Sequence, residues 1–267
     1  MRPRPYYLLA LIAMPARPYI LAETTWQAVK DAAFEVVVLP WGATEAHNYH
    51  LPYGTDNYQC DYLAAEAARL AWEQGAKVVV LPTIPFGVNT GQLDITLDMN
   101  LNPSTQLAIL RDIVQVLARQ GIPKLVVLNG HGGNDFRQML RELQAAFPEV
   151  FLSTATLFRI VDRSQFFEAP GDHADEMETS MMLHIAPDLV RPLAEAGTGA
   201  SKQFRIRALR EWAWAQREWS QVSADTGVGN PAAATAAKGA AFLAAAAQEL
   251  SQFLVELAAA DPHDLYE

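Results

Sequence analysis

Carboxylate and imidazole side chains crowd into one short stretch of the chain. The stretch LPWGATEAHNYHLPYGTD (39–56) follows an apolar run at 36–38, and it contains Glu45, His47, His50 and Asp56. Buried strands do not normally end in so many ionisable groups, because such groups are rarely buried unless they are paired. Imidazole and carboxylate together are ligands for zinc, manganese or iron. A capped turn with a solvated Glu45 is the simpler alternative for this stretch by itself.

Two later segments carry the same residue types. NGHGGN (129–134) contains His131, and GDHADEMETS (171–180) contains His173 and Glu176. Simpler interpretations are a phosphate-binding nest for the first and, for the second, a helical turn whose acids favour the helix dipole. We expect one shared metal site, because all three segments follow predicted strands. Two carboxylates and two histidines exceed what one catalytic zinc needs, so a third carboxylate indicates two metal ions with one carboxylate bridging them.

The apolar runs that precede these segments are short, rich in β-branched residues and separated by stretches with helical periodicity. Strands are predicted at 34–40, 77–87, 124–130 and 150–158, and helices at 57–74, 102–121, 135–147, 175–190 and 230–260. Near-continuous apolar strands are typical of parallel sheets covered on both faces. The alternation predicts the α/β class, with a mostly parallel sheet and helices on both faces of a single domain over 1–267. Ligands of such sheets bind beyond the carboxyl ends of the strands.

Charge and cysteine content narrow the class of protein. The net charge of −10 and the pI of about 5.1 weigh against partners such as nucleic acid or an anionic membrane, which need a basic surface. Cys60 is the single cysteine, which excludes an intrachain disulfide and a cysteine metal cluster. A reducing, cytoplasmic setting fits this composition. We expect a small-molecule substrate.

The first residues, MRPRPYYLLALIAMPARPYI, combine basic residues with a short apolar run, as a signal peptide does. Pro15 interrupts the run and no small-x-small cleavage site follows it, so we expect residues 1–18 to be an N-terminal extension. No segment has the roughly 20 apolar residues that a transmembrane helix requires.

Four motifs together resemble those of the creatininase family: LPWGATEAHNYHLPYGTD, LPTIPFGV, NGHGGN and HADEMETS. The resemblance extends from Tyr19 to Leu257. It implies a single α/β domain that hydrolyses C–N bonds, often of cyclic amides. It also implies two divalent metal ions per subunit, zinc or manganese or both, with iron as a further candidate. Assembly as a homohexamer, a trimer of dimers, is implied as well.

The resemblance also assigns roles by position. It implies metal binding by Glu45, His47, Asp56, His131 and Glu176. Asp56 matches the bridging carboxylate, and Glu176 matches an acid that serves as fifth ligand and in catalysis. His173 matches the histidine beside the substrate, where an ordinary pKa of about 6.5 suits a catalytic proton shuttle. The role of Glu178 stays open: it either supports the ligands or is an ordinary residue on the helix surface.

Departures from the family pattern affect the expected substrate. Asp175 stands where glycine is usual, NGHGGN has no acid after its histidine, and the segment 88–105 differs from the commoner pattern. We favour a hydrolase of a small cyclic amide. The alternatives are a relative that processes formamides or precursor peptides and a non-catalytic small-molecule binder. The tryptophan-rich segment 210–220 is expected at a subunit interface or in a loop over the pocket.

Overall fold

A computed structural model describes residues 16–169 and 171–267, so residues 1–15 of the expected N-terminal extension lie outside the described part. Four strands form one sheet in the order β2-β1-β3-β4. They are β1 (Val36–Trp41), β2 (Val78–Val80), β3 (Lys124–Asn129) and β4 (Phe151–Thr156). Every neighbouring pair runs parallel, which confirms the predicted fold class.

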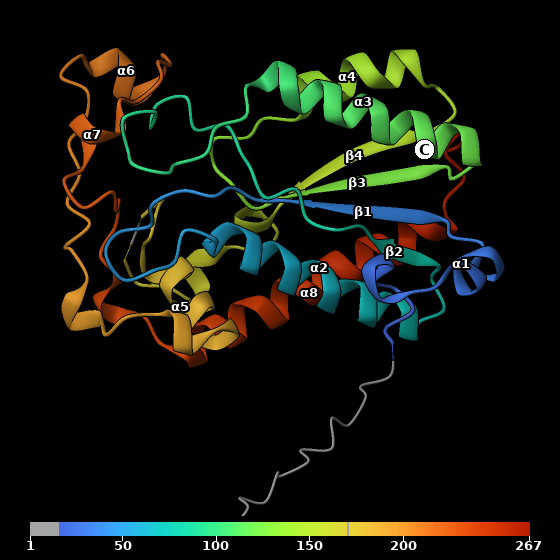
Figure 1. Ribbon diagram of the computed structural model, residues 1–267, viewed down its shortest axis with the longest axis horizontal. Helices are drawn as coiled ribbons and strands as arrows, with labels where there is room; N and C mark the ends of the chain where they lie inside the picture. Colours follow the sequence, from blue (N-terminus) through green and yellow to red (C-terminus); the bar gives the residue numbers. More distant parts are fainter. Residues whose placement is uncertain (1–15, 170) are drawn as a thin grey trace, which may run out of the picture.

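Helices cover both faces of this sheet (Figure 1). One face carries α2 (Thr55–Glu73), α5 (Glu176–Ile185) and α8 (Ala236–Ala259), and the other carries α3 (Pro103–Gln120) and α4 (Arg137–Ala146). Shorter helices are α1 (Trp26–Ala32), α6 (Arg207–Glu211) and α7 (Trp219–Val222). The 3-10 helices are Leu21–Glu23, Leu157–Arg159, Arg163–Gln165, Pro187–Leu189, Leu193–Glu195 and Pro231–Ala233. None of the helices in the described ranges is long and apolar enough to cross a membrane.

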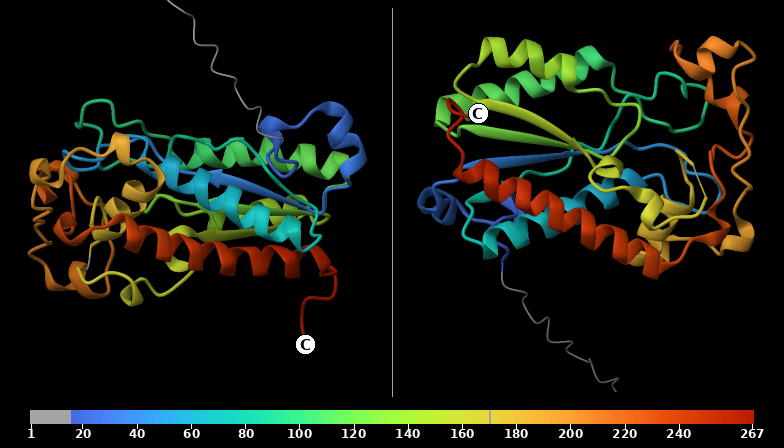
Figure 2. Two further views of the ribbon diagram at one scale, coloured as in Figure 1. Left: turned by 90° about the horizontal axis from the view of Figure 1, so that it is seen from below. Right: turned by 180° about the vertical axis from the view of Figure 1, so that it is seen from behind.

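Alternating side chains of β1 build two separate cores. Val36 and Val38 pack with residues of α2 and α8, and Figure 2 shows these two helices lying along each other. Val37 and Leu39 point the other way and pack with residues of α3 and α4. Successive side chains of a strand point to opposite faces, so a strand covered on both sides must be apolar at every position. The buried run at β1 therefore anchors the strand from whose end the polar segment emerges.

Element boundaries differ from the predicted ones where proline or a cap intervenes. The strand predicted at 77–87 ends at Val80, because Pro82 and Pro85 have no N–H group to donate to a sheet. The last helix begins at Ala236 rather than at residue 230. The side chain of Thr235, directly before the helix, caps it by accepting a hydrogen bond from the backbone N–H of Lys238.

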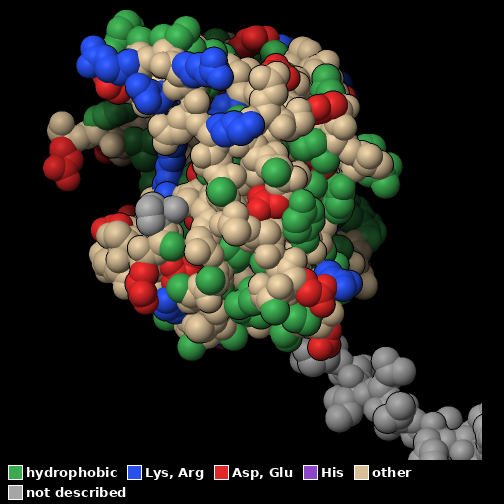
Figure 3. All heavy atoms as spheres, turned by 90° about the vertical axis from the view of Figure 1, so that its left-hand side faces the viewer, with side chains coloured by type: hydrophobic (Ala, Val, Ile, Leu, Met, Phe, Trp, Pro, Cys, Tyr) green, Lys and Arg blue, Asp and Glu red, His purple; other side chains and the backbone are tan. Residues whose placement is uncertain are grey.

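The carboxyl ends of the strands meet on the side of the molecule that carries α5, α6 and α7 (Figure 1). Figure 3 views the molecule from that side and shows Lys and Arg side chains gathered on its upper part, beside a hollow at the left edge. The polar segments after β1 and β3 and the start of α5 lie at this end.

Candidate metal centre and active site

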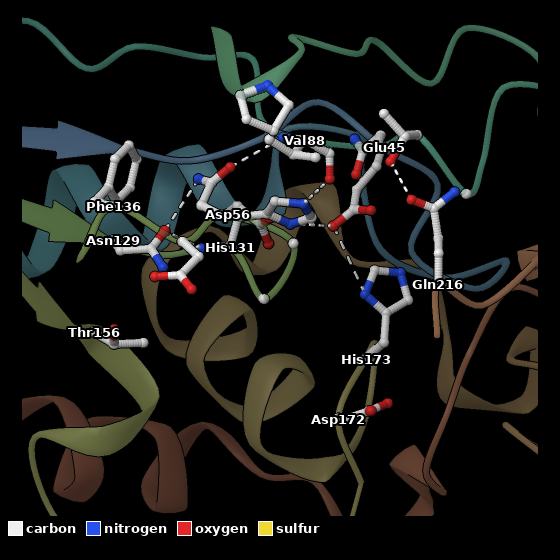
Figure 4. Close-up of a pocket in the computed structure, with 18 of the residues that line it drawn as sticks. Glu45, Asp56, Val88, Asn129, His131, Phe136, Thr156, Asp172, His173 and Gln216 are labelled. Atoms are coloured by element: carbon white, nitrogen blue, oxygen red, sulfur yellow. Dashed lines mark hydrogen bonds and ion pairs between the residues drawn. The ribbon is translucent and has the colours of Figure 1, made fainter. Parts of the chain in front are cut away.

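Acidic and imidazole groups from three chain segments meet beyond the ends of β1 and β3. Asp56, in the first turn of α2, lies between two imidazoles: its Oδ1 is 3.0 Å from Nε2 of His47 and its Oδ2 is 3.0 Å from Nδ1 of His131. The Oε1 of Glu45 is 2.9 Å from the same His131 nitrogen. All four side chains are buried. Figure 4 shows Glu45, Asp56, His131 and His173 pointing toward one another.

Each of the three imidazoles donates one ring N–H to a backbone carbonyl. The bonds are His47 Nδ1 to Glu45 O (3.1 Å), His131 Nε2 to Val88 O (3.1 Å) and His173 Nε2 to Ala46 O (2.8 Å). A carbonyl oxygen can only accept, so these bonds determine which nitrogen carries the proton in the neutral ring. The other nitrogen of each ring faces the carboxylates. Metal-ligating histidines are held in this way, so the donor set fits a divalent cation.

His173 lies at the edge of the cluster. Its Nδ1 is 3.8 Å from Oε1 of Glu45, and its ring centroid is 4.2 Å from that of His47. The indole of Trp219 packs edge-on against the imidazole at 5.2 Å. Burial and the neighbouring charge of His47 lower the pKa of His173, so the ring is neutral with an available lone pair on Nδ1. The role of proton shuttle stays a prediction that this position favours.

Glu176 was expected among the metal ligands, but the structure places its carboxylate outside the cluster. Its carboxylate accepts hydrogen bonds from the backbone N–H groups of Glu168 and Ala169 and pairs with Nζ of Lys238 at 2.6 Å. Glu178 lies in the cluster instead. Two residues along a helix correspond to a rotation of about 200°, so these two acids leave α5 on opposite sides.

Glu178 approaches the cluster from the first turn of α5. One of its oxygens is 3.8 Å from Nε2 of His47 and accepts a hydrogen bond from the backbone N–H of Ala174. Ala174 has a φ of 49°, a left-handed conformation that is uncommon for a residue with a side chain. Asp175 caps the helix by accepting from the backbone N–H of Glu178. This local turn directs His173 and Glu178 to the same point.

Ligand atoms in the described part of the chain form three groups, each within 4.8 Å. The groups are Glu45, His47 and His173; Glu45, Asp56 and His131; and His47, Asp56 and Glu178. Because the groups share members, neighbouring ions could share ligands here, as they do in dinuclear sites.

Opposite charges hold the cluster together when no metal is bound. Burial favours the neutral ring, but the carboxylate of Asp56 outweighs it and raises the pKa of His47 to about 10. Burial is likewise outweighed at His131, whose pKa is raised by Glu45 and Asp56. Burial raises the pKa of Glu178 to about 8. Ligands must be deprotonated to bind a metal, so the cation takes the place of these protons.

The metal-free protein is expected to lose stability as the pH rises toward about 10. Stability falls with pH wherever the folded state binds more protons than the unfolded state. His47 meets this condition between its ordinary pKa of 6.5 and about 10, and Glu178 between 4.5 and about 8. Thermal unfolding of the chelated protein at several pH values tests the sign. A melting temperature that increases over this range would contradict the assigned charges.

A loop from a distant part of the sequence supports the segment that carries Glu45. Nε2 of Gln92 donates to Oε2 of Glu45 at 2.7 Å, and Oδ1 of Asp98 accepts from the backbone N–H of Ala46 at 2.6 Å. Sequence reasoning missed both residues. The only available signal was their position in the segment 88–105, which follows β2 and departs from the family pattern.

Gly133→Ala is expected to weaken metal binding by about tenfold or more, the effect typical of losing a group that orients a ligating histidine. A Cβ at Gly133 would lie 2.2 Å from the Val88 carbonyl oxygen and 2.5 Å from His131 Nε2, the two atoms of one orienting hydrogen bond. A Cβ at Gly132 would meet nothing within 4 Å, so Gly132→Ala is the matched control. Zinc titration compares the two variants, and equal affinities would refute this role of the bond.

The cluster forms part of the wall of a pocket of about 1310 Å³. Other parts of the wall are residues 88–92, the start of α4, the end of β4 and residues 214–217. The last of these segments is tied to the pocket by a hydrogen bond from Thr90 to Gln216, marked in Figure 4. Trp214 lines the pocket, as predicted for a tryptophan in a loop over it. Trp212 does not line the pocket.

Comparison with known families agrees with this geometry. The family described as creatinine amidohydrolase matches residues 22–254. The chain belongs to the creatininase family. The resemblance inferred from the four motifs is thereby confirmed, and the chain is a hydrolase of that family.

Individual relatives within the creatininase family act on different substrates. The chain is 27% identical to creatinine amidohydrolase of Pseudomonas putida over 200 residues, covering 66% of this chain and 75% of that protein. It is 28% identical to the mycofactocin precursor peptide peptidase of Mycobacterium ulcerans over 212 residues, covering 76% of this chain and 78% of that protein.

Solved structures of the creatininase family share the fold. A Bacteroides fragilis protein named after creatinine amidohydrolase superposes with a TM-score of 0.88 at 43% identity, over 94% of this chain and 99% of that chain. A manganese form of creatininase superposes with a TM-score of 0.74 at 24% identity, over 89% of this chain and 98% of that chain. A zinc form of a creatininase mutant superposes with a TM-score of 0.71 at 24% identity, over 89% of this chain and 97% of that chain.

Proposed function

We propose that the protein is a metal-dependent hydrolase of amide C–N bonds. The observation that supports this most directly is the set of three imidazoles, each fixed by a backbone carbonyl, around three buried carboxylates. The manganese and zinc forms among creatininase structures support the same class of cation. Two ions per subunit, zinc or manganese, are proposed because the ligand groups overlap.

The residues that would hold the ions are Glu45, His47, Asp56, His131 and Glu178. Bound divalent ions would supply a water of lowered pKa and would polarise a carbonyl oxygen. Asp56 presents one oxygen to each of two imidazoles, so its carboxylate could serve two ions at once. Gln92 holds Glu45 in place through its amide, so the ligand set is oriented before anything binds.

His173 is proposed to move the proton. Its Nε2–H is committed to the Ala46 carbonyl, so a proton is gained and lost at Nδ1, which faces the cluster. A neutral ring can accept a proton while the tetrahedral centre forms and then deliver it to the leaving nitrogen. Trp219 limits the rotation of the imidazole by packing edge-on against it.

Two substrate classes compete within this function. The sequence favours a small cyclic amide, and the relationship to creatinine amidohydrolase supports it. A peptide-type amide is the second candidate, supported by the relationship to a precursor peptide peptidase. The pocket volume of about 1310 Å³ favours the second, because pockets for small molecules usually measure about 300–1,000 Å³.

Metal analysis and a substrate panel test the proposal together. The purified protein should contain zinc or manganese by elemental analysis, lose activity on chelation and regain it with either ion. Creatinine, lactams, formamides and short N-acyl peptides form the panel. A metal-loaded protein that hydrolyses no amide in a broad panel would refute the proposed function and leave a binding protein on the same fold.

We further propose a single-domain, cytoplasmic homo-oligomer, with a hexamer as the expected form. Ile206 and Trp212 are 62% and 78% exposed on the segment that carries α6, and large exposed apolar side chains favour a protein interface. Light scattering after size exclusion measures the mass. Trp212→Ser is expected to reduce it, and a wild-type monomer at all concentrations would contradict the proposal.

A further inference from the structure

The pocket continues well beyond the metal ligands, toward the ends of β3 and β4. We infer that the substrate is an amide that also carries an anionic group, a carboxylate or a phosphate, which Arg137 and Arg159 bind. This inference rests on the proposed function and specifies its substrate class.

The two arginines come from neighbouring strands. Arg137 is the first residue of α4, which follows β3, and Arg159 ends the 3-10 helix that follows β4. Because β3 and β4 are paired side by side, their carboxyl ends deliver both residues to the same pocket wall. Both side chains are exposed, so an incoming ligand can reach them.

Other charged residues of this wall already have partners. Arg217 pairs with Asp172 at 2.9 Å, Arg163 lies 3.9 Å from Asp175, and Glu142 pairs with Arg111 at 2.6 Å. Asp135 accepts from the backbone N–H of Arg137. Within residues 16–169 and 171–267, no carboxylate lies within 4.0 Å of the guanidinium of Arg137 or Arg159.

The charge of the whole chain makes this arrangement more specific. The protein carries a net charge of −10, so two arginines without carboxylate partners in this pocket wall do not reflect a generally basic surface. Guanidinium groups bind carboxylates and phosphates through paired hydrogen bonds. A small neutral amide held at the metal ligands would leave both arginines without a partner, whereas an amide with an anionic group further along would use them.

Matched substrates and matched variants test the inference. The substrates are N-acyl dipeptides with a free terminal carboxylate, the same peptides as terminal amides, and analogues with a phosphate in place of the carboxylate. The variants are Arg137→Gln, Arg159→Gln and the double variant. Arg141→Gln is the control, because Arg141 is exposed on the same helix one turn further on and does not line the pocket.

The double variant is expected to lose about tenfold or more in kcat/KM for the anionic substrates and less than about twofold for the neutral ones. Arg141→Gln should match the wild type with both. The preferred anionic series identifies the group as carboxylate or phosphate. Equal rates for charged and neutral substrates in the wild type would overturn the inference while leaving amide hydrolysis intact.

Binding gives a second readout that does not depend on turnover. N-acetylglycine and inorganic phosphate are titrated into the zinc-loaded proteins by calorimetry. At least one should bind the double variant about tenfold more weakly than the wild type. If the variant binds both as the wild type does, the anions bind elsewhere and the inference is wrong. Arginine-dependent binding without hydrolysis of any amide would support the anion site and reject the proposed function.

Discussion

Asp56→Asn is expected to remove metal binding and to lower amide hydrolysis by about 10³-fold or more. The carboxylate meets His47 with one oxygen and His131 with the other, at 3.0 Å each, so it belongs to two of the three ligand groups. The amide of asparagine keeps the shape but loses the charge and one acceptor. Stabilisation of transition-state charge by a metal is worth several kcal/mol, which corresponds to the expected loss.

Elemental analysis and kcat measured on the same preparation check this result. Asp61→Asn is the control, because Asp61 is an exposed carboxylate on the same helix, one turn or so beyond Asp56. His131→Ala should behave as Asp56→Asn does. Full turnover by a metal-free His131→Ala protein would disprove the mechanism, since the ligand set could then not supply the catalytic cation.

Glu178→Gln and Glu176→Gln are expected to give opposite results, although the two acids are separated by one residue. Glu178→Gln should lose metal and lower hydrolysis by about 10²-fold or more, because it removes a charged ligand from the group with His47 and Asp56. Glu176→Gln should keep its metal and much of its activity. It should melt at a lower temperature, because the buried carboxylate holds Lys238 and two backbone N–H groups.

The paired comparison needs metal content, kcat and melting temperature for both variants. Lys238→Met serves as a further control, since it breaks the same ion pair as Glu176→Gln from the side of α8. A Glu176→Gln protein that loses metal with an unchanged melting temperature would reverse the assignment and restore the expectation from the motif.

Much of the fold follows directly from the order of the residues. The continuous apolar runs at β1 and β3 predict strands covered on both faces, and the alternating helices predict their parallel arrangement. Polar motifs directly after those strands must then meet at one edge of the sheet. For this reason Glu45, His47, Asp56 and His131 could be expected near each other, and the structure brings them together.

Tertiary structure decided the features that depend on how an element is rotated or on contacts between distant segments. Glu176 and Glu178 are equivalent as residue types, and only the start of α5 after the Asp175 cap determines which of them faces the cluster. The pairing of Gln92 with Glu45 joins positions 47 residues apart, and no local pattern specifies it.

The sequence by itself therefore determined the sheet, the family and most of the candidate ligand set, because each depends on short-range periodicity and on which segment follows which strand. Only the folded chain selected Glu178 over Glu176 and left Arg137 and Arg159 without carboxylate partners in the described pocket wall. The physical reason is that side-chain direction and charge pairing depend on the complete packing of α4, α5 and α8 around the sheet. No single segment contains that information.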